Sequence, residues 1–197
     1  MDSRIIIRTA NVDDSQALGK LYQALFLDQA KYDPRLKLDP KFEPERLLRI
    51  MLLNGRHKFF VAVDQERIVG FFQVNIFYGD QLLQIMPSEL EGFWKKLHPL
   101  RIVRKALKTM LNWLEPRVEV PPTFEKIRAG YLANSYVLPE YQGQGIYRRF
   151  SEQALEFLRQ HKVDIVYFNA YLDNQIVINF WKKQGFKISK VIMTKDL

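Results

Sequence analysis

The sequence feature that most constrains the fold is a pair of glycines, Gly143 and Gly145, within the stretch VLPEYQGQGIYRRF at 137–150. The pair separates a β-like run from a helix-like run. Glycine adopts positive φ at little cost, so one interpretation is a tight turn that binds nothing. The other is a loop whose backbone N–H groups converge at the positive end of a helix dipole, where they hold a phosphate. Both interpretations require a strand, a turn and a helix in that order.

The spacing of the glycines narrows the choice of phosphate ligand. The stretch lacks the G-x-x-x-x-G-K-S/T pattern, so no lysine is placed to reach a γ-phosphate. It also lacks G-x-G-x-x-G, because position 148 is arginine. Nucleoside triphosphates and dinucleotides therefore lose support.

The rest of the chain alternates between strand-like and helix-like runs. β-branched and aromatic runs predict strands at 5–8, 58–63, 68–77, 126–137 and 165–168, the last of them buried. Apolar residues at helical spacing predict helices after Asn11, from Pro44, over 146–161 and over 175–184. Asp64–Arg67 joins the second and third strands, which predicts a hairpin.

The long segment at 78–126 does not belong to this alternation of strands and helices. It is too long for a bare connection and has its own helix signal near 100–114, so we expect an insertion within a single domain spanning 1–197. The net charge is +8, and residues 93–114 contain six basic residues and no acidic one. A basic amphipathic helix there fits an acidic substrate, an RNA or an anionic membrane, but also an ordinary solvated face.

Several kinds of chemistry lack the residues they need. The chain has no cysteine, which excludes disulfides, thiolate metal ligands and a cysteine nucleophile. The histidines, His57, His98 and His161, are isolated in the sequence and are expected at the surface or at helix ends, so no metal site is predicted. The N-terminus has neither signal-peptide nor membrane-spanning character, and we expect a cytoplasmic protein.

Three separated segments resemble the GNAT superfamily of N-acyltransferases. The pattern V-x-P-x-x-Q-G-x-G at 137–145 resembles its acyl-CoA-binding motif. Ile7–Ala10, followed by Asp13 and Asp14, resembles its first strand and helix, and Asn174–Phe186 resembles its N-x-x-x-x-x-F-Y-x-x-x-G-F segment. Each pattern is weak alone, but together they cover most of the chain outside the insertion. The resemblance implies an α/β (α+β) fold with a mixed, mostly antiparallel central sheet flanked by helices and a helical insertion.

The resemblance also implies a binding site for acetyl-CoA as co-substrate. In the family the glycine loop holds the CoA diphosphate through backbone N–H groups, and the central strands separate at a bulge, here near Ser135–Val137. The pantetheine arm lies there like an extra strand, and the amide of Val137 polarises the thioester carbonyl. The implied cofactor-binding residues are Ser135, Tyr136, Val137, Gln142, Gly143, Gln144, Gly145, Ile146, Tyr147, Arg148, Asn174 and Trp181.

Two of these residues, Arg148 and Asn174, have alternative interpretations. Arg148 or its neighbour Arg149 adds charge beside the phosphates, or either one belongs to a solvated helix face. Asn174 bonds the pantetheine arm, or it caps the last helix.

Direct transfer of an acyl group to an amine needs a base, a site for the oxyanion and an acid for the departing thiolate. The family's usual acid, a tyrosine, falls at Trp181, whose indole cannot serve as an acid at neutral pH. Tyr171, Tyr136 or Tyr147 are the possible substitutes. The strand at 126–138 contains no aspartate or glutamate, so Glu125, Tyr131 or ordered water are the candidate bases.

The sequence therefore predicts an N-acetyltransferase that moves an acetyl group from acetyl-CoA directly to a primary amine of a small molecule, peptide or protein. Its predicted catalytic residues are Val137, Tyr171, Tyr131 and Glu125. One alternative is a catalytically weak acyl-CoA-binding module. Another is a basic protein that associates with RNA or membrane through the insertion helix. The oligomeric state stays open, with a dimer among the options.

Overall fold

A computed structural model describes residues 5–33, 35–55, 57–78 and 127–189. The predicted insertion, together with Glu125 and His98, lies outside the described residues, apart from Tyr78 at its first position. Among the described residues, no helix is both long enough and apolar enough to cross a membrane.

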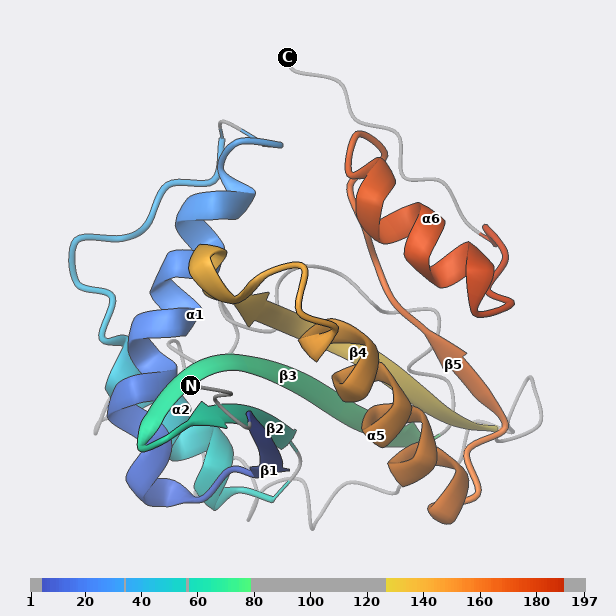
Figure 1. Ribbon diagram of the computed structural model, residues 1–197, viewed down its shortest axis with the longest axis horizontal. Helices are drawn as coiled ribbons and strands as arrows, with labels where there is room; N and C mark the ends of the chain where they lie inside the picture. Colours follow the sequence, from blue (N-terminus) through green and yellow to red (C-terminus); the bar gives the residue numbers. More distant parts are fainter. Residues whose placement is uncertain (1–4, 34, 56, 79–126, 190–197) are drawn as a thin grey trace, which may run out of the picture.

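The described strands form one mixed sheet in the order β1-β2-β3-β4-β5 (Figure 1). Antiparallel pairing joins β1 to β2, β2 to β3 and β3 to β4, whereas β4 and β5 run parallel. The strands are β1 (Ile6–Thr9), β2 (His57–Asp64), β3 (Arg67–Tyr78), β4 (Arg128–Val137) and β5 (Ile165–Tyr167). The predicted hairpin, and the mostly antiparallel sheet, are confirmed.

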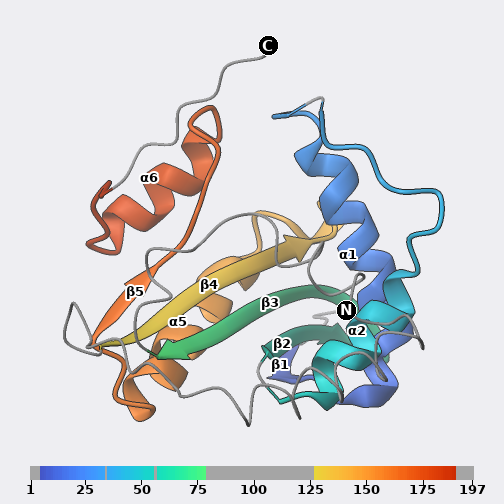
Figure 2. The ribbon, with the colours of Figure 1, turned by 180° about the vertical axis from the view of Figure 1, so that it is seen from behind.

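Helices cover both faces of this sheet (Figure 2). One face carries α1 (Ser15–Gln29) and α2 (Pro44–Leu53), and the other carries α5 (Ile146–Gln160) and α6 (Gln175–Lys183). Short 3-10 turns, η1 (Val12–Asp14) and η3 (Pro139–Tyr141), precede α1 and the glycine loop. All four predicted helices are present: those over 146–161 and 175–184 agree with α5 and α6 to within one residue at each end, α2 begins at Pro44 as predicted, and α1 begins at Ser15 after η1.

Each face of the sheet has its own apolar core. Leu18, Tyr22, Leu48 and Phe71 are among the buried residues on the α1/α2 face. Phe72, Phe150 and Trp181 belong to the core on the α5/α6 face. Alternate residues of β3 enter opposite cores because successive side chains of a strand point to opposite faces.

Gly19 sets how closely α1 approaches α2. A β-carbon at this position would lie 2.8 Å from the backbone nitrogen of Glu45. The absence of a side chain therefore lets α1 pack directly against the first turn of α2.

The prediction of a buried strand at 165–168 was wrong in one respect. Ile165 is 47% exposed, because β5 is the last strand of the sheet among the described residues and contacts β4 over a short length. A continuous apolar run does not distinguish a central strand from an edge strand.

A β-bulge interrupts the pairing of β3 with β4. Phe72 pairs with Ser135 and Val74 with Leu132, so Ala133 and Asn134 together stand opposite the single residue Gln73. The bulge expected near Ser135–Val137 is therefore present, and it lies immediately before Ser135. The extra residue changes the alternation of side chains, which places both Leu132 and Val137 in the core on the α5/α6 face.

Candidate active site

The loop between β4 and α5 is lined with backbone N–H groups. Gly143 and Gly145 have φ of 77° and 76°, and Gly145 is the N-cap of α5 without any side-chain cap. Among the described residues, no hydrogen bond is donated by the backbone N–H groups of 143–148. A β-carbon at Gly143 or Gly145 would meet no atom within 4 Å. The loop therefore presents unused donors to open space at the positive end of a helix dipole.

Gln142 does not extend this set of donors, although the sequence placed it there. Its backbone N–H donates to the carbonyl oxygen of Pro139 at 3.2 Å. Its side chain instead donates from Nε2 to the carbonyl oxygen of Val137 at 2.9 Å. Gln142 thus ties the loop to the end of β4.

Contacts with the β2–β3 hairpin and with β1 hold this loop in place. Arg67 forms an ion pair with Glu140 at 3.1 Å, and the Tyr141 hydroxyl donates to Asp64 Oδ2 at 2.9 Å. Arg149 donates to the carbonyl oxygen of Ile5 at 3.0 Å. These contacts join two distant segments, the hairpin and the start of β1, to the loop.

Arg148 and Arg149 have different surroundings. Arg149 is committed to Ile5, whereas Arg148 is exposed and makes no ion pair with the described residues. Arg148 therefore is the one of the two that can neutralise an anion bound at the start of α5.

Next to the loop, β4 has an edge without a strand partner among the described residues. The β4–β5 pairing ends at Tyr131 with Tyr167, although β4 continues to Val137. The N–H of Leu138 donates to the carbonyl oxygen of Val69 on β3 at 2.9 Å. Because successive amides of a strand alternate in direction, the Val137 amide points away from β3, to this open edge.

On the α5/α6 face, Tyr147 lies between β4 and α6. Its hydroxyl oxygen accepts a hydrogen bond from Trp181 Nε1 at 3.2 Å. Burial raises the pKa of Tyr147, and hydrogen bonds from Ser135 and Trp181 partly offset that rise. Trp181 itself is only 1% exposed, so it contacts Tyr147 but does not form an exposed wall of the site.

On the α1/α2 face, a buried polar network reaches the bulge of β4. Asn134 Nδ2 donates to the Tyr22 hydroxyl at 2.7 Å and to Gln73 Oε1 at 3.1 Å. The Tyr22 hydroxyl also donates to Gln73 Oε1, at 3.1 Å. On its other side Gln73 Nε2 lies 3.1 Å from His57 Nδ1 and 3.3 Å from Asn75 Oδ1.

Sequence reasoning missed this network. Gln73 and Asn75 are 2% and 3% exposed, and two such amides within an apolar strand were a signal that was available. The surface or capping role expected for His57 was wrong, because β2 places its ring within 3.0 Å of Asn75 Oδ1. His161 is exposed and caps the end of α5, as expected.

The three other tyrosines with a predicted role lie apart from Tyr147. Tyr136 packs against the core on the α1/α2 face, and burial raises its pKa. Tyr171 stacks on Tyr32 with ring centroids 5.6 Å apart, and burial also raises its pKa. The Tyr131 hydroxyl accepts a hydrogen bond from Asn169 Nδ2 at 3.4 Å.

Asn174 has the capping role that was one of its two interpretations. Its Oδ1 accepts from the backbone N–H of Val177 at 3.3 Å, at the start of α6. Its Nδ2 makes no hydrogen bond among the described residues, so the capping role leaves both N–H groups of this nitrogen for a ligand.

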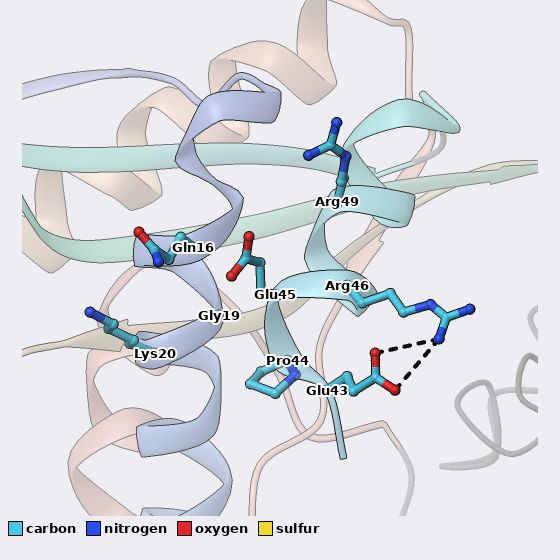
Figure 3. Close-up of a pocket in the computed structure, with 8 residues that line it drawn as sticks. All are labelled: Gln16, Gly19, Lys20, Glu43, Pro44, Glu45, Arg46 and Arg49. Atoms are coloured by element: carbon cyan, nitrogen blue, oxygen red, sulfur yellow. Dashed lines mark hydrogen bonds and ion pairs between the residues drawn. The ribbon is translucent and has the colours of Figure 1, made fainter. Parts of the chain in front are cut away.

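A pocket in the described part of the chain lies at the crossing of α1 and α2, away from the glycine loop. Figure 3 shows its lining, where Arg46 and Glu43 form an ion pair at 3.4 Å. None of the predicted cofactor-binding residues contributes to it. Its lining residues are Gln16, Gly19, Lys20, Glu43, Pro44, Glu45, Arg46 and Arg49.

A mixed sheet that opens beside a loop of unused amides, itself the start of a helix, is the arrangement of an acyl-CoA-dependent acetyltransferase. Comparison with family models agrees: the Acetyltransferase (GNAT) family model matches residues 20–186. The chain belongs to this family, and the predicted fold and enzyme class are confirmed.

Solved structures with the same fold differ widely from this chain in sequence. A tetramutant of the BH1408 protein from Bacillus halodurans has a TM-score of 0.68 at 18% identity, covering 98% of this chain and 99% of that one. A ribosomal-protein-alanine N-acetyltransferase from Brucella melitensis biovar Abortus 2308 has 0.60 at 11%, covering 98% and 99%. The aminoglycoside N-acetyltransferase AAC(6')-Iy, in complex with CoA, has 0.61 at 11%, covering 100% and 97%. The search of curated proteins returned no match.

Proposed function

We propose that this acetyltransferase moves the acetyl group of acetyl-CoA directly to a primary amine of a small molecule, peptide or protein. The observation that carries the proposal is the set of backbone N–H groups at 143–148, which have no partner among the described residues and lie beside the open edge of β4. These donors fit a diphosphate, because each phosphate oxygen accepts several hydrogen bonds and glycine lets it approach the backbone.

The adjoining strand fits the rest of the cofactor. A pantetheine arm carries amide groups, and the open edge of β4 between Tyr131 and Val137 presents backbone groups that can pair with them. The Val137 amide then donates to the thioester carbonyl oxygen, where negative charge develops during attack by the amine. The missing cysteine agrees with direct transfer, which needs no covalent enzyme intermediate.

The acceptor side of the site is proposed to be the α1/α2 face. The cofactor loop begins α5 on the opposite face, so an amine that attacks the thioester has access from the side of Tyr131 and Asn134. Tyr131 stays a candidate base, as does Glu125 outside the described residues, and Tyr171 stays a candidate acid. Two of the neighbouring structures are enzymes named for amine acceptors, an aminoglycoside and a ribosomal-protein alanine.

Thermal unfolding with graded acetyl-CoA tests the cofactor half of this proposal. At about 100 times its dissociation constant, a ligand of the folded state adds about 2.7 kcal/mol of stability. For a chain of this size we expect a rise in Tm of about 5–10 °C. Acetyl-pantetheine is the control: it carries the same thioester but no diphosphate, and it should give a small shift.

An amine panel scored for released thiol tests the transfer. Amine-dependent release of CoA is the expected result. Tight binding of acetyl-CoA without release by any amine would instead support a binding module. Equal shifts with acetyl-CoA and acetyl-pantetheine would contradict the diphosphate site.

A further inference from the structure

The hydroxyl of Tyr147 is a polar group held within an aromatic cluster beside the open edge of β4. The Tyr147 ring packs on Phe180 and Phe72 with centroid distances of 4.9 and 5.7 Å. Its oxygen accepts the Trp181 indole N–H at 3.2 Å, and the Ser135 side chain on β4 lowers the pKa of the same hydroxyl. The hydroxyl therefore lies between β4 and α6, next to the part of β4 that does not pair with β5.

The position of Tyr147 in the chain brings this hydroxyl to the proposed cofactor. Tyr147 follows Ile146 in the first turn of α5, so its own backbone N–H is one of the unused donors of the loop. Ser135 lies two residues before Val137 on the same strand, and both belong to the part of β4 beyond its pairing with β5. One side chain thus connects the diphosphate loop with the strand edge proposed to hold the thioester.

We propose that Tyr147 is the acid that protonates the departing thiolate, with Trp181 and Ser135 as residues that position its hydroxyl. This inference rests on the proposed acetyl transfer. The Trp181 indole cannot act as an acid at neutral pH, but its N–H donates a hydrogen bond to the hydroxyl oxygen of Tyr147, which can act as one.

The other two candidate acids are on the wrong side of the sheet or committed elsewhere. The Tyr136 side chain packs in the core on the α1/α2 face, opposite the loop that begins α5. Tyr171 stacks on Tyr32 at the end of α1. Among the three, Tyr147 alone has a hydrogen bond to α6, through Trp181.

The amine nitrogen forms a bond to the carbonyl carbon, and the carbon–sulfur bond breaks with its electron pair on sulfur. The proton of Tyr147 Oη moves to that sulfur, which yields the thiol. The phenolate oxygen keeps the electron pair of its O–H bond and is stabilised by the donors of Trp181 and Ser135. The phenolate then takes up a proton from solvent. The attacking amine nitrogen releases one proton to solvent, so the proton count balances.

Burial keeps this acid protonated until it acts. The pKa of Tyr147 is raised by burial above its ordinary value, so the phenol carries its proton throughout the physiological pH range. The two hydrogen bonds to its oxygen lower the pKa, which makes the proton easier to give up at the moment of transfer.

The test uses Tyr147→Phe, which keeps the ring contacts and removes the hydroxyl. Two quantities are measured: kcat with an active amine, and the pKa of the bound CoA thiol, from the ultraviolet absorbance of the thiolate. We expect kcat to fall on the order of 10²-fold, affinity for CoA to change less than about threefold, and the thiol pKa to rise. Tyr32→Phe is the control, because it removes a tyrosine hydroxyl outside the Tyr147 cluster and leaves the ring that stacks on Tyr171 in place.

A second substitution that restores a hydroxyl distinguishes loss of the acid from loss of side-chain packing. The Trp181 ring nitrogen lies 3.2 Å from Tyr147 Oη, so Trp181→Tyr in the Tyr147→Phe background should return a hydroxyl to nearly the same place and recover part of kcat. Ser135→Ala should lower kcat less than Tyr147→Phe and move the thiol pKa in the same direction.

The outcomes that contradict this inference differ from those that contradict the proposed function. Wild-type kcat and thiol pKa in the Tyr147→Phe variant would overturn the inference and leave the proposed function standing. A wild-type protein that binds CoA but turns over no amine would overturn the proposed function. The pKa of the bound CoA thiol would then still show whether the Tyr147 hydroxyl reaches the sulfur. The same thiol pKa in wild type and in Tyr147→Phe would refute the inference.

Discussion

Gly145 shows how one backbone conformation determines what a loop can bind. Its φ of 76° makes it the N-cap of α5, yet it has no side chain to occupy the N–H groups of the first turn. A serine or aspartate at an N-cap would use one of those donors internally. With Gly145 at this position, α5 has no side-chain cap, and the N–H groups of its first turn are left for a ligand.

Replacing Gly145 with alanine should weaken acetyl-CoA binding at least tenfold. Positive φ disfavours a β-carbon by roughly 1 kcal/mol, and the added methyl occupies the space in front of the donors. Isothermal titration calorimetry measures the affinity, and urea unfolding measures the stability.

Gly55→Ala is the matched control for this prediction. Gly55 also has positive φ, 66°, and a β-carbon added there would meet no atom within 4 Å, but this glycine follows α2 on the other face of the sheet. Both variants should lose similar stability, and only Gly145→Ala should lose affinity. Equal affinity in the two variants would remove the loop from the binding site.

At the scale of an element, the start of α1 is held by side chains on both sides of η1. Asn11 Oδ1 accepts from the backbone N–H of Asp13 at 3.0 Å, and Asp14 Oδ2 accepts from the N–H of Asn11 at 2.8 Å. Arg8 on β1 binds both carboxylate oxygens of Asp14, at 2.7 and 2.8 Å. Asp14 therefore joins the edge strand to the helix.

Asp14→Asn should destabilise the protein at neutral pH by about 1–2 kcal/mol. The Arg8 guanidinium, and then the hydrogen bond from Asn11, lower the pKa of Asp14 below its ordinary value, against the opposing effect of burial. Because the folded pKa is the lower one, the stabilisation is present above the unfolded pKa and is lost as pH falls through the folded pKa.

The difference between wild type and Asp14→Asn should therefore shrink in acid. Urea unfolding at a series of pH values measures it. Asp13→Asn is the control, because the exposed Asp13 side chain makes no hydrogen bond or ion pair with the described residues. A difference that stays constant down to strongly acidic pH would contradict the role of the charge.

At the scale of the whole molecule, the end of β4 lies beside α1, whereas α6 lies on the side of β5 (Figures 1 and 2). The stack of Tyr32 on Tyr171, with the rings 11° from parallel, joins the end of α1 to the segment between β5 and α6. It is a contact across the open side of the sheet, where the acceptor is proposed to enter.

Tyr32→Ala should loosen that segment without unfolding the protein. Loss of an aromatic pair costs about 0.5–1.5 kcal/mol, so the global stability should change little. Hydrogen–deuterium exchange should be faster at 168–174, and Tyr32→Phe should restore slow exchange. Unchanged exchange in the alanine variant would show that the stack does not restrain the segment.

The sequence by itself determined the features whose physics lies within a few residues: the cap at Asn11, the hairpin at Asp64–Arg67, the helix faces and the glycine turn. These follow from backbone preference and apolar periodicity, which act locally. The family motifs added the order of the elements and the acyltransferase class.

Only the tertiary structure decided which distant side chains meet. One extra residue at Ala133–Asn134 reverses the alternation of β4, which brings Ser135 to the face of Tyr147 and Trp181 and directs Asn134 to Tyr22 and Gln73. A register shift of this kind is set by the packing of whole strands and helices. The choice of Tyr147 among the three candidate acids depends on this shift, as does the buried polar network, and so both required the three-dimensional structure.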